Sequence, residues 1–285
     1  MLISKGQKVS GEVIQKIRRF TGVFKISPDS FEIWNGANSK REMFCHNESG
    51  NGISNEVKLN NICNSPEESC KCDEVIQSFG QRKGIRNERI LEKPNKLLSS
   101  IIFESKNEPW WIYINALANR LSWLYTHSID VAMMSLIIAV ELGYEEKQLY
   151  NLGLGALMHD VGKLLLPKEI IEKQEPLSIT EEILIQQHCE LGVSSLVSFN
   201  LPHECTNIVM QHHERLDGSG YPKGLKDNEI SLDSRIVMIA DAIDTISAGR
   251  PSRPDVYGLD EAIRIIKSEE GFSIVLLAML EKILH

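Results

Sequence analysis

Apolar residues in the second part of the chain recur with the period of an α-helix. Between residues 129 and 140 they fall three or four positions apart, and Gly143 follows where such a helix would end. The same spacing predicts further helices at 149–158, 208–213 and 236–246.

A capping box predicts where another helix begins. Ser178 is followed three residues later by Glu181, and the helix that starts there is expected to continue to Leu196. The alternation of apolar and polar residues that is typical of strands does not interrupt these segments. Residues 101–285 are therefore predicted to form an all-α helical bundle domain.

The first hundred residues have a different pattern. Residues 23–26 and 31–34 alternate in a way that predicts two short strands around a turn. Residues 35–75 are rich in Asn and Ser and predict a long loop, and the polar stretch 81–96 predicts a linker or an exposed helix. We expect a small N-terminal region of mixed or irregular structure over 1–100. Its role is open, and a degenerate sensor or an interaction segment would both fit.

Length, composition and charge narrow the classes of function. A chain of 285 residues with 42% hydrophobic residues can bury a sizeable core, which excludes a disordered or fibrous protein. Residues 1–100 carry 16 basic and 12 acidic side chains, whereas 101–285 carry 15 and 27. This negative balance repels a nucleic-acid backbone, so a nucleic-acid polymer is not an expected partner. A small anionic ligand would have to be held by metal ions or by a few placed Lys and Arg.

Neither a secretion signal nor a membrane span is predicted. Charged residues are scattered through the first positions, where a signal peptide would have an apolar core. The longest apolar run, 131–140, is about half of the roughly 20 residues that cross a bilayer. We expect a cytoplasmic protein that does not bind membranes. The oligomeric state is open, with a homodimer among the expectations.

Most of the six cysteines lie in the polar N-terminal stretch, at Cys45, Cys63, Cys70 and Cys72. Together with His46 they could ligate zinc, but the paired C-x2-C spacing of common zinc modules is missing. Unpaired thiols in a reducing compartment are the favoured interpretation.

Candidate chemistry gathers in the second part of the chain. Six of the eight histidines lie between residues 127 and 213. The adjacent pair His159-Asp160 can point into one cavity, as can Asp241 and Asp244, which are three residues apart on one helix face. Imidazole nitrogens and carboxylate oxygens without thiolates favour Fe(II) or Mn(II) over a closed tetrahedral zinc site. Each histidine alone could equally be a hydrogen-bonded core residue or a helix cap, and only together do they indicate a metal centre.

Several short segments then occur together in one order and spacing. They are Tyr125-Thr-His-Ser128, Leu157-Met-His-Asp-Val-Gly-Lys163, Pro167, Lys173, His188, Gln211-His-His-Glu-Arg-Leu-Asp-Gly-Ser-Gly-Tyr-Pro222, Arg235-Ile-Val-Met-Ile-Ala-Asp241 and Arg250-Pro-Ser-Arg253. The series resembles the HD-GYP domain family of the HD superfamily, metal-dependent phosphohydrolases that cleave the bacterial second messenger cyclic di-GMP. The resemblance implies an all-α HD/HD-GYP helical bundle over about residues 105–285, and it says nothing about residues 1–100.

The resemblance also implies a binuclear centre with two divalent metal ions, Fe or Mn. The implied ligands are His127, His159, Asp160 and Asp241 for one metal, and Asp160, His188, His212 and His213 for the other. Asp160 would bridge the metals and act as a catalytic residue together with Lys163, which would counter charge on the phosphate oxygens. On its residue type alone, Lys163 could instead be an exposed cation at a helix end, since Gly162 beside it permits a helix stop.

A second implied set binds the substrate. It comprises Lys163, Lys173, Gly220, Tyr221, Arg250 and Arg253. Tyr221 could present its ring to a guanine, and its loop could also be a surface for protein partners. Without the resemblance, the glycine-rich loop would be a surface turn and the two arginines solvated charges.

The chain departs from the family pattern in four places. Trp123 stands one helical turn before His127, where members with a third metal carry Glu, so a two-metal site is predicted. For the same reason the linear dinucleotide 5′-pGpG is expected as the product rather than GMP. The other departures, which could alter substrate fit, are Gln174-Glu175, Ser252 and Ser273.

Three functions therefore fit the sequence. We expect a metal-dependent cyclic di-GMP phosphodiesterase in bacterial signalling. An HD hydrolase of another cyclic dinucleotide is the second, because the metals recognise phosphate and only the pocket recognises the base. The third is a signalling module that binds the nucleotide or docks partners with little turnover.

Overall fold

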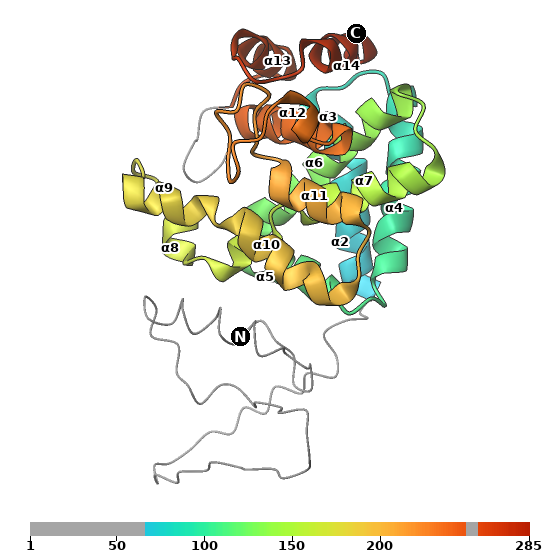
Figure 1. The fold of residues 1–285 in the computed structure, drawn as a ribbon. Helices are drawn as coiled ribbons and strands as arrows, with labels where there is room; N and C mark the ends of the chain where they lie inside the picture. Colours follow the sequence, from blue (N-terminus) through green and yellow to red (C-terminus); the bar gives the residue numbers. More distant parts are fainter. Residues whose placement is uncertain (1–65, 249–255) are drawn as a thin grey trace, which may run out of the picture. The chain divides into compact units, whose positions relative to one another are not determined.

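The computed structural model describes residues 66–248 and 256–285, and all regular elements in those two ranges are helical (Figure 1). The predicted strands at 23–26 and 31–34 lie outside the described residues, as do Cys45, His46 and Cys63. The α-helices are α2 (Pro66–Gln77), α3 (Phe79–Lys83), α4 (Arg89–Ser105), α5 (Trp111–Arg120), α6 (Ser122–Glu141), α7 (Glu146–Met158), α8 (Lys168–Ile171), α9 (Ile179–Gln186), α10 (His188–Leu196), α11 (His203–Gln211), α12 (Leu232–Ser247), α13 (Leu259–Ser268) and α14 (Ile274–Leu284). Short 3₁₀ helices occupy Val161–Leu165, Val197–Phe199 and Asp227–Glu229.

Helix α6 is the core of this bundle. Every residue from 127 to 139 is buried, and α4, α5, α7 and α12 pack around the helix. By length and hydropathy α6 could cross a membrane, but 83% of its apolar window is buried inside the protein. That burial is what a central core helix requires.

The predicted helices of the second part are confirmed, with two corrections at helix ends. Helices α6, α7 and α12 cover the segments predicted at 129–140, 149–158 and 236–246, and Gly143 adopts a left-handed φ of 76° just after α6. Helix α11 covers the segment predicted at 208–213 only as far as Gln211. The capping box of Ser178 and Glu181 is formed at the start of α9. The single helix expected from there to Leu196 is wrong, because α9 ends before Gln187, whose N–H bonds the carbonyl of Leu184 in a tighter turn.

The compact unit that contains these helices begins at Asn64, well before residue 101. Helix α4 runs through the expected boundary and buries Leu91, Leu98, Ile101 and Ile102, and it contacts α6 and α7. The stretch 81–96 is therefore no linker, because it contains the end of α3 and the first part of α4, and both helices bury residues in the core.

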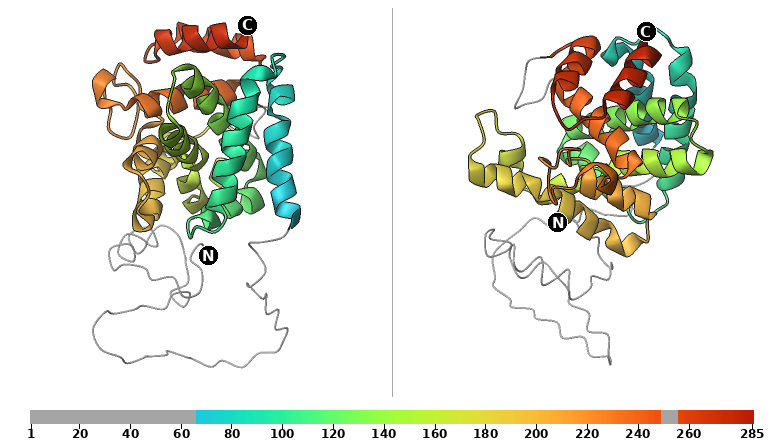
Figure 2. Two further views of the ribbon diagram at one scale, coloured as in Figure 1. Left: turned by 90° about the vertical axis from the view of Figure 1, so that its right-hand side faces the viewer. Right: turned by 45° about the horizontal axis from the view of Figure 1, so that its top comes forward.

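The remaining helices lie around this core. Helices α2 and α4 run side by side along one flank, whereas α13 and α14 lie together next to α12 (Figures 1 and 2). Helices α8 and α9 are neighbours on the side of α10 (Figure 1). The ends of α7, α10 and α11 thereby meet α6 and α12 in the interior.

Candidate metal centre

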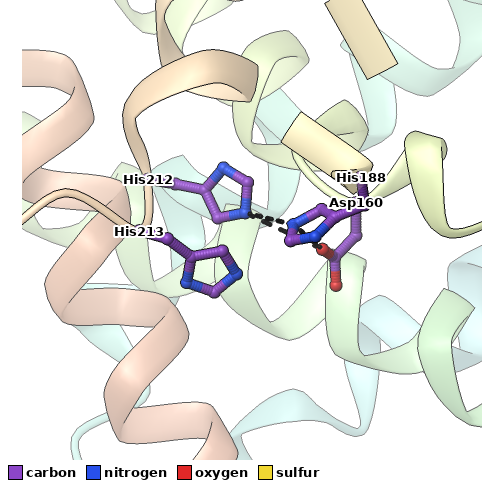
Figure 3. Close-up of side chains that lie close together, drawn as sticks. All are labelled: Asp160, His188, His212 and His213. Carbon is purple, nitrogen blue, oxygen red and sulfur yellow. Dashed lines mark hydrogen bonds and ion pairs between the residues drawn. The ribbon is translucent and has the colours of Figure 1, made fainter. Parts of the chain in front are cut away.

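The structure brings all seven expected metal ligands into one buried cluster. His127 comes from α6, His159 and Asp160 from the end of α7, His188 from the start of α10, His212 and His213 from the end of α11, and Asp241 from α12. The potential ligand atoms fall into two groups, and within each group they lie within 4.8 Å of one another. Figure 3 shows the group of Asp160 and three histidines, with dashed lines between Asp160, His188 and His212.

The first group consists of His127, His159 and Asp241. The Nε2 atom of His127 lies 3.2 Å from Nε2 of His159 and 3.1 Å from Oδ1 of Asp241. Oδ2 of Asp160 faces the same group, at 3.3 Å from His159 Nε2 and 3.6 Å from His127 Nε2. Two imidazoles and two carboxylates therefore surround one small volume.

The second group uses the other oxygen of Asp160. Oδ1 lies 3.3 Å from Nε2 of His188 and 3.8 Å from Nε2 of His212. The two histidine Nε2 atoms are 3.1 Å apart, and the ring of His213 packs against His212 with 4.1 Å between centroids. Because its two oxygens face different groups, the Asp160 carboxylate has the geometry of a bridge.

The Nδ1 atoms fix how these rings are turned. Nδ1 of His159 bonds the carbonyl of Ala156 at 2.7 Å, and Nδ1 of His188 bonds that of Ile185 at 2.6 Å. Nδ1 of His212 lies 3.1 Å from the carbonyls of Ile208 and Val209. A carbonyl only accepts, so in the neutral rings the proton is on Nδ1 and the lone pair is on Nε2, inside the cluster.

Burial and neighbouring charges set the protonation of the cluster. Burial lowers the pKa of His188 to about 3. Burial by itself would raise the pKa of both aspartates, but Lys163 at Asp160 and His127 at Asp241 outweigh it and hold each carboxyl pKa well below its usual range. Near neutral pH the imidazole is therefore neutral and the carboxylates are ionised, which are the forms that bind a cation.

A divalent metal fits this donor set. Oδ1 of Asp160 is buried, and among the residues that the structure describes no hydrogen-bond donor reaches it. It faces the lone pair of His188 Nε2 across 3.3 Å, so two acceptors point at each other in a buried place. Such an arrangement is costly unless a cation lies between the acceptors. The seven donors are nitrogen and oxygen, and the neighbouring Cys189 thiol is no competitor because burial raises its pKa.

Gly162 explains how α10 comes close enough to deliver His188. A Cβ atom at Gly162 would stand 1.9 Å from the carbonyl oxygen of His188 and 2.7 Å from the nitrogen of Gly192. The 3₁₀ helix Val161–Leu165 therefore packs directly on the backbone of α10. The glycine is needed for this close approach rather than for a helix stop.

A pocket of about 390 Å³ opens beside the cluster, and Trp123, Lys163 and Lys173 are among its lining residues. Lys163 is 9% exposed and donates to Oδ2 of Asp160 at 2.6 Å, so it is not the exposed cation of the alternative interpretation. Lys173 is paired with Glu181 at 2.7 Å. Both lysines and Trp123 thus border one space next to the candidate ligand Asp160.

The buried carboxylate of Glu214 holds the glycine-rich loop that contains Gly218, Gly220 and Gly224. Glu214 accepts the backbone N–H groups of Lys223 at 2.8 Å and of Leu225 at 2.9 Å. A Cβ at Gly220 would meet the backbone of Glu214 at 2.4 Å, so this position requires glycine. The ring of Tyr221 lies 4.7 Å from that of His213, so it is beside the candidate ligand cluster.

The remaining residues to place are the two arginines expected to bind substrate and two charged residues near His127. Arg250 and Arg253 lie outside the described residues, so their expected role in substrate binding stays a prediction. Asp244, which was expected to point into the same cavity as Asp241, lies behind a ligand ring instead, with its Oδ2 2.5 Å from Nδ1 of His127. Lys83, for which no role was expected, donates to Oδ1 of Asp244 at 2.5 Å, and no local signal in the sequence marks it.

The chain is similar to several known phosphodiesterases. A cyclic di-GMP phosphodiesterase of Pseudomonas aeruginosa is 30% identical over 183 residues, which are 64% of this chain and 41% of that protein. A cyclic di-GMP phosphodiesterase of Thermotoga maritima is 36% identical over 149 residues, 52% of this chain and 40% of that protein. A 3′3′-cGAMP-specific phosphodiesterase of Vibrio cholerae is 36% identical over 155 residues, 54% of this chain and 36% of that protein. The chain thus spans well under half the length of these relatives.

The fold has a counterpart among solved structures. An HDG"Y"P protein of Bdellovibrio bacteriovorus superimposes with a TM-score of 0.51 at 20% identity, covering 76% of this chain and 80% of that one. The family model described as HD domain matches residues 112–273, which include all seven clustered ligands. The resemblance found in the motifs is thereby confirmed, and the chain belongs to the HD domain family.

Proposed function

We propose that this chain is a metal-dependent phosphodiesterase that hydrolyses cyclic di-GMP to 5′-pGpG. The observation that carries the proposal is the Asp160 carboxylate, whose two oxygens face two separate groups of buried histidines. The names of the Pseudomonas and Thermotoga relatives support the substrate. Because the chain spans only part of those proteins, the activity is a proposal for this chain.

The proposal includes two divalent ions, with Fe(II) or Mn(II) favoured by the nitrogen and oxygen donors. When bound, the two cations would lower the pKa of a water molecule and withdraw charge from a phosphoryl group. Trp123 lines the pocket where a carboxylate could otherwise extend the ligand set, which supports two ions rather than three.

The surrounding side chains would bind and orient the dinucleotide. Lys163 borders the pocket and holds Oδ2 of Asp160, so it can contact a phosphate oxygen while keeping the bridging carboxylate in place. Lys173 borders the same pocket. Tyr221 packs beside His213 and is proposed to contact a guanine, with Arg250 and Arg253 completing the substrate-binding set.

A second substrate is favoured by one specific observation. The Vibrio relative named as specific for 3′3′-cGAMP is as similar to this chain as the Thermotoga cyclic di-GMP enzyme, at 36% identity. Nothing in the ligand cluster distinguishes the two, because the cluster addresses phosphate and not the base. The specificity must then lie in the pocket and the Tyr221 loop.

One comparison of substrates tests these alternatives. Mn²⁺-loaded protein is incubated with cyclic di-GMP, 3′3′-cGAMP or cyclic di-AMP, and the products are separated by chromatography, with His159→Ala as the inactive control. Fastest turnover of cyclic di-GMP is the expected result. Faster turnover of 3′3′-cGAMP would show that 3′3′-cGAMP, and not cyclic di-GMP, is the preferred substrate. Tight binding without turnover, unchanged in His159→Ala, would indicate a signalling module instead.

The wider setting is proposed with the activity. A cytoplasmic location, the absence of membrane and nucleic-acid polymer partners, docking of proteins through the Tyr221 loop and a homodimer all remain expectations from the sequence. The role of residues 1–100 stays open.

A further inference from the structure

A buried group of charges joins α3 to the proposed metal centre. The Nζ atom of Lys83 donates to Oδ1 of Asp244 at 2.5 Å and to Oγ of Ser247 at 3.1 Å, and it lies 3.6 Å from Oδ2 of Asp130. Arg82 forms a second ion pair with Asp130. Lys83 is 7% exposed, Asp130 3% and Asp244 2%, so these three residues are hidden from solvent, whereas the Arg82 side chain is 29% exposed.

The group ends on a metal ligand. The Asp244 carboxylate uses Oδ1 for Lys83 and Oδ2 for Nδ1 of His127, at 2.5 Å in both cases. The Nε2 atom of the same His127 ring faces His159 at 3.2 Å and Asp241 at 3.1 Å. A carboxylate that accepts from Nδ1 fixes the ring orientation and leaves Nε2 as the metal-binding atom. Lys83 in turn fixes the carboxylate.

Stability alone is a poor reason for this arrangement. A buried ion pair contributes little net stability, because desolvation of the charges offsets their attraction. Each of the other clustered histidines that uses Nε2 is anchored by a backbone carbonyl of its own or a neighbouring turn. His127 instead depends on a side chain from α12, and that side chain depends on Lys83 from α3.

We propose that Lys83 is a positioning residue for the metal site formed by His127, His159, Asp160 and Asp241. It holds Asp244 so that the His127 ring presents Nε2 to the site. Lys83 lies before residue 112, where the match to the HD domain begins. The segment that precedes the family domain would therefore take part in building its metal centre. This inference rests on the proposed metal-dependent function.

Metal titration of full-length variants tests the inference. Lys83→Met removes the ammonium and keeps a chain of similar length, and Lys83→Arg restores a cation. The matched control is Tyr144→Phe, because Tyr144, three residues after the end of α6, donates to Asp233 at the start of α12 at 2.8 Å. This bond ties the region of α6 to α12, as the pair of His127 and Asp244 does. Asp233 is eight residues from Asp241, or about 12 Å along the helix. Mn²⁺ binding is followed by calorimetry, and folding by circular dichroism and thermal melting.

The expected result is that wild type binds two Mn²⁺ and that Lys83→Met weakens one of the two equivalents by about 10- to 100-fold, as loss of an outer partner typically does. Lys83→Arg recovers most of that affinity, and Tyr144→Phe leaves both equivalents unchanged. Asp244→Asn weakens the same equivalent, and adding Lys83→Met to it causes no further loss, since Lys83 acts through Asp244.

The failures are distinguishable. A wild-type protein that binds no Mn²⁺ would overturn the proposed function. Wild type with two bound ions and Lys83→Met with unchanged affinities would overturn the role of Lys83 alone. The role of Lys83 would also be overturned if Lys83→Met and Tyr144→Phe both weakened metal binding in proportion to their loss of thermal stability. A Lys83→Met chain that does not fold would overturn it too, because Lys83 would then be a structural residue.

Discussion

Replacing Gly162 by Ala should remove His188 from the metal centre while leaving most of the bundle folded. The new Cβ would stand 1.9 Å from the carbonyl oxygen of His188 and 2.8 Å from its carbonyl carbon. Ordinary van der Waals contact begins at 3.4 Å, so the 3₁₀ helix and α10 must separate by about 1.5 Å. Both partners are backbone, so no side chain can move aside to relieve the clash.

A displacement of that size exceeds what a metal site tolerates, since ligand distances must hold to about 0.2 Å. We therefore expect Gly162→Ala to lose the equivalent bound by Asp160, His188, His212 and His213. Overpacking of this kind costs about 1–3 kcal/mol. At roughly 2–4 °C per kcal/mol for a unit of this size, the melting temperature of the metal-free protein should fall by about 2–12 °C.

The assay is metal content by elemental analysis after equilibration with Mn²⁺, together with thermal melting. Gly153→Ala is the matched control, because its Cβ would meet at 2.6 Å only the terminal Cδ1 of Ile101, a side-chain atom that can turn away. The control should keep both ions. If Gly162→Ala also keeps two ions at wild-type affinity, the packing of α10 on Gly162 does not place His188, and the reasoning is refuted.

Three further outcomes are expected. Glu214→Gln should raise KM for the dinucleotide about tenfold without changing metal content. The amide keeps only one of the two acceptor oxygens that hold the glycine-rich loop, and losing the other costs ~1–2 kcal/mol. Steady-state kinetics measure KM, and an unchanged KM would contradict this prediction. The metal-free protein should lose stability as pH falls from about 6.5 toward about 3, because His188 binds a proton in the unfolded chain but stays neutral when it is buried in the folded protein. Melting temperatures that do not change with pH would contradict this prediction. Removing the metals with a chelator should lower the melting temperature, since a ligand at 100 times its Kd stabilises by about 2.7 kcal/mol, and readdition of Mn²⁺ should restore it.

The candidate metal ligands could be singled out from sequence because each stands in a local pattern, and the structure brings them together. Each histidine stands at a helix end or on a periodic helix, and His159 and Asp160 are adjacent in the chain. The outer partners could not be predicted in the same way. Lys83 is separated from Asp244 by 161 positions, and a lysine at the end of a short polar helix has the pattern of a solvated charge. Only the packing of α3 in the bundle makes it a buried donor.

The helices, like the site residues, divide into those with a strong local signal in the sequence and those without one. The long apolar period of α6 and the capping box of α9 are strong local signals, and both helices begin or continue where expected. The boundary expected at residue 101 falls inside α4, which alternates buried Leu and Ile with many polar residues and contains Pro94, so its buried face is narrow. Such a face is specified by the neighbours it meets, α6 and α7, rather than by its own composition.

The central claim is that two metal ions on one buried cluster make this chain a cyclic di-GMP phosphodiesterase. The most direct test is to count the metal ions in purified, Mn²⁺-loaded protein and then to identify the product formed from cyclic di-GMP by chromatography. We predict two equivalents and accumulation of 5′-pGpG, both reduced in Asp160→Asn. A protein that holds two equivalents and leaves cyclic di-GMP intact would contradict the claim.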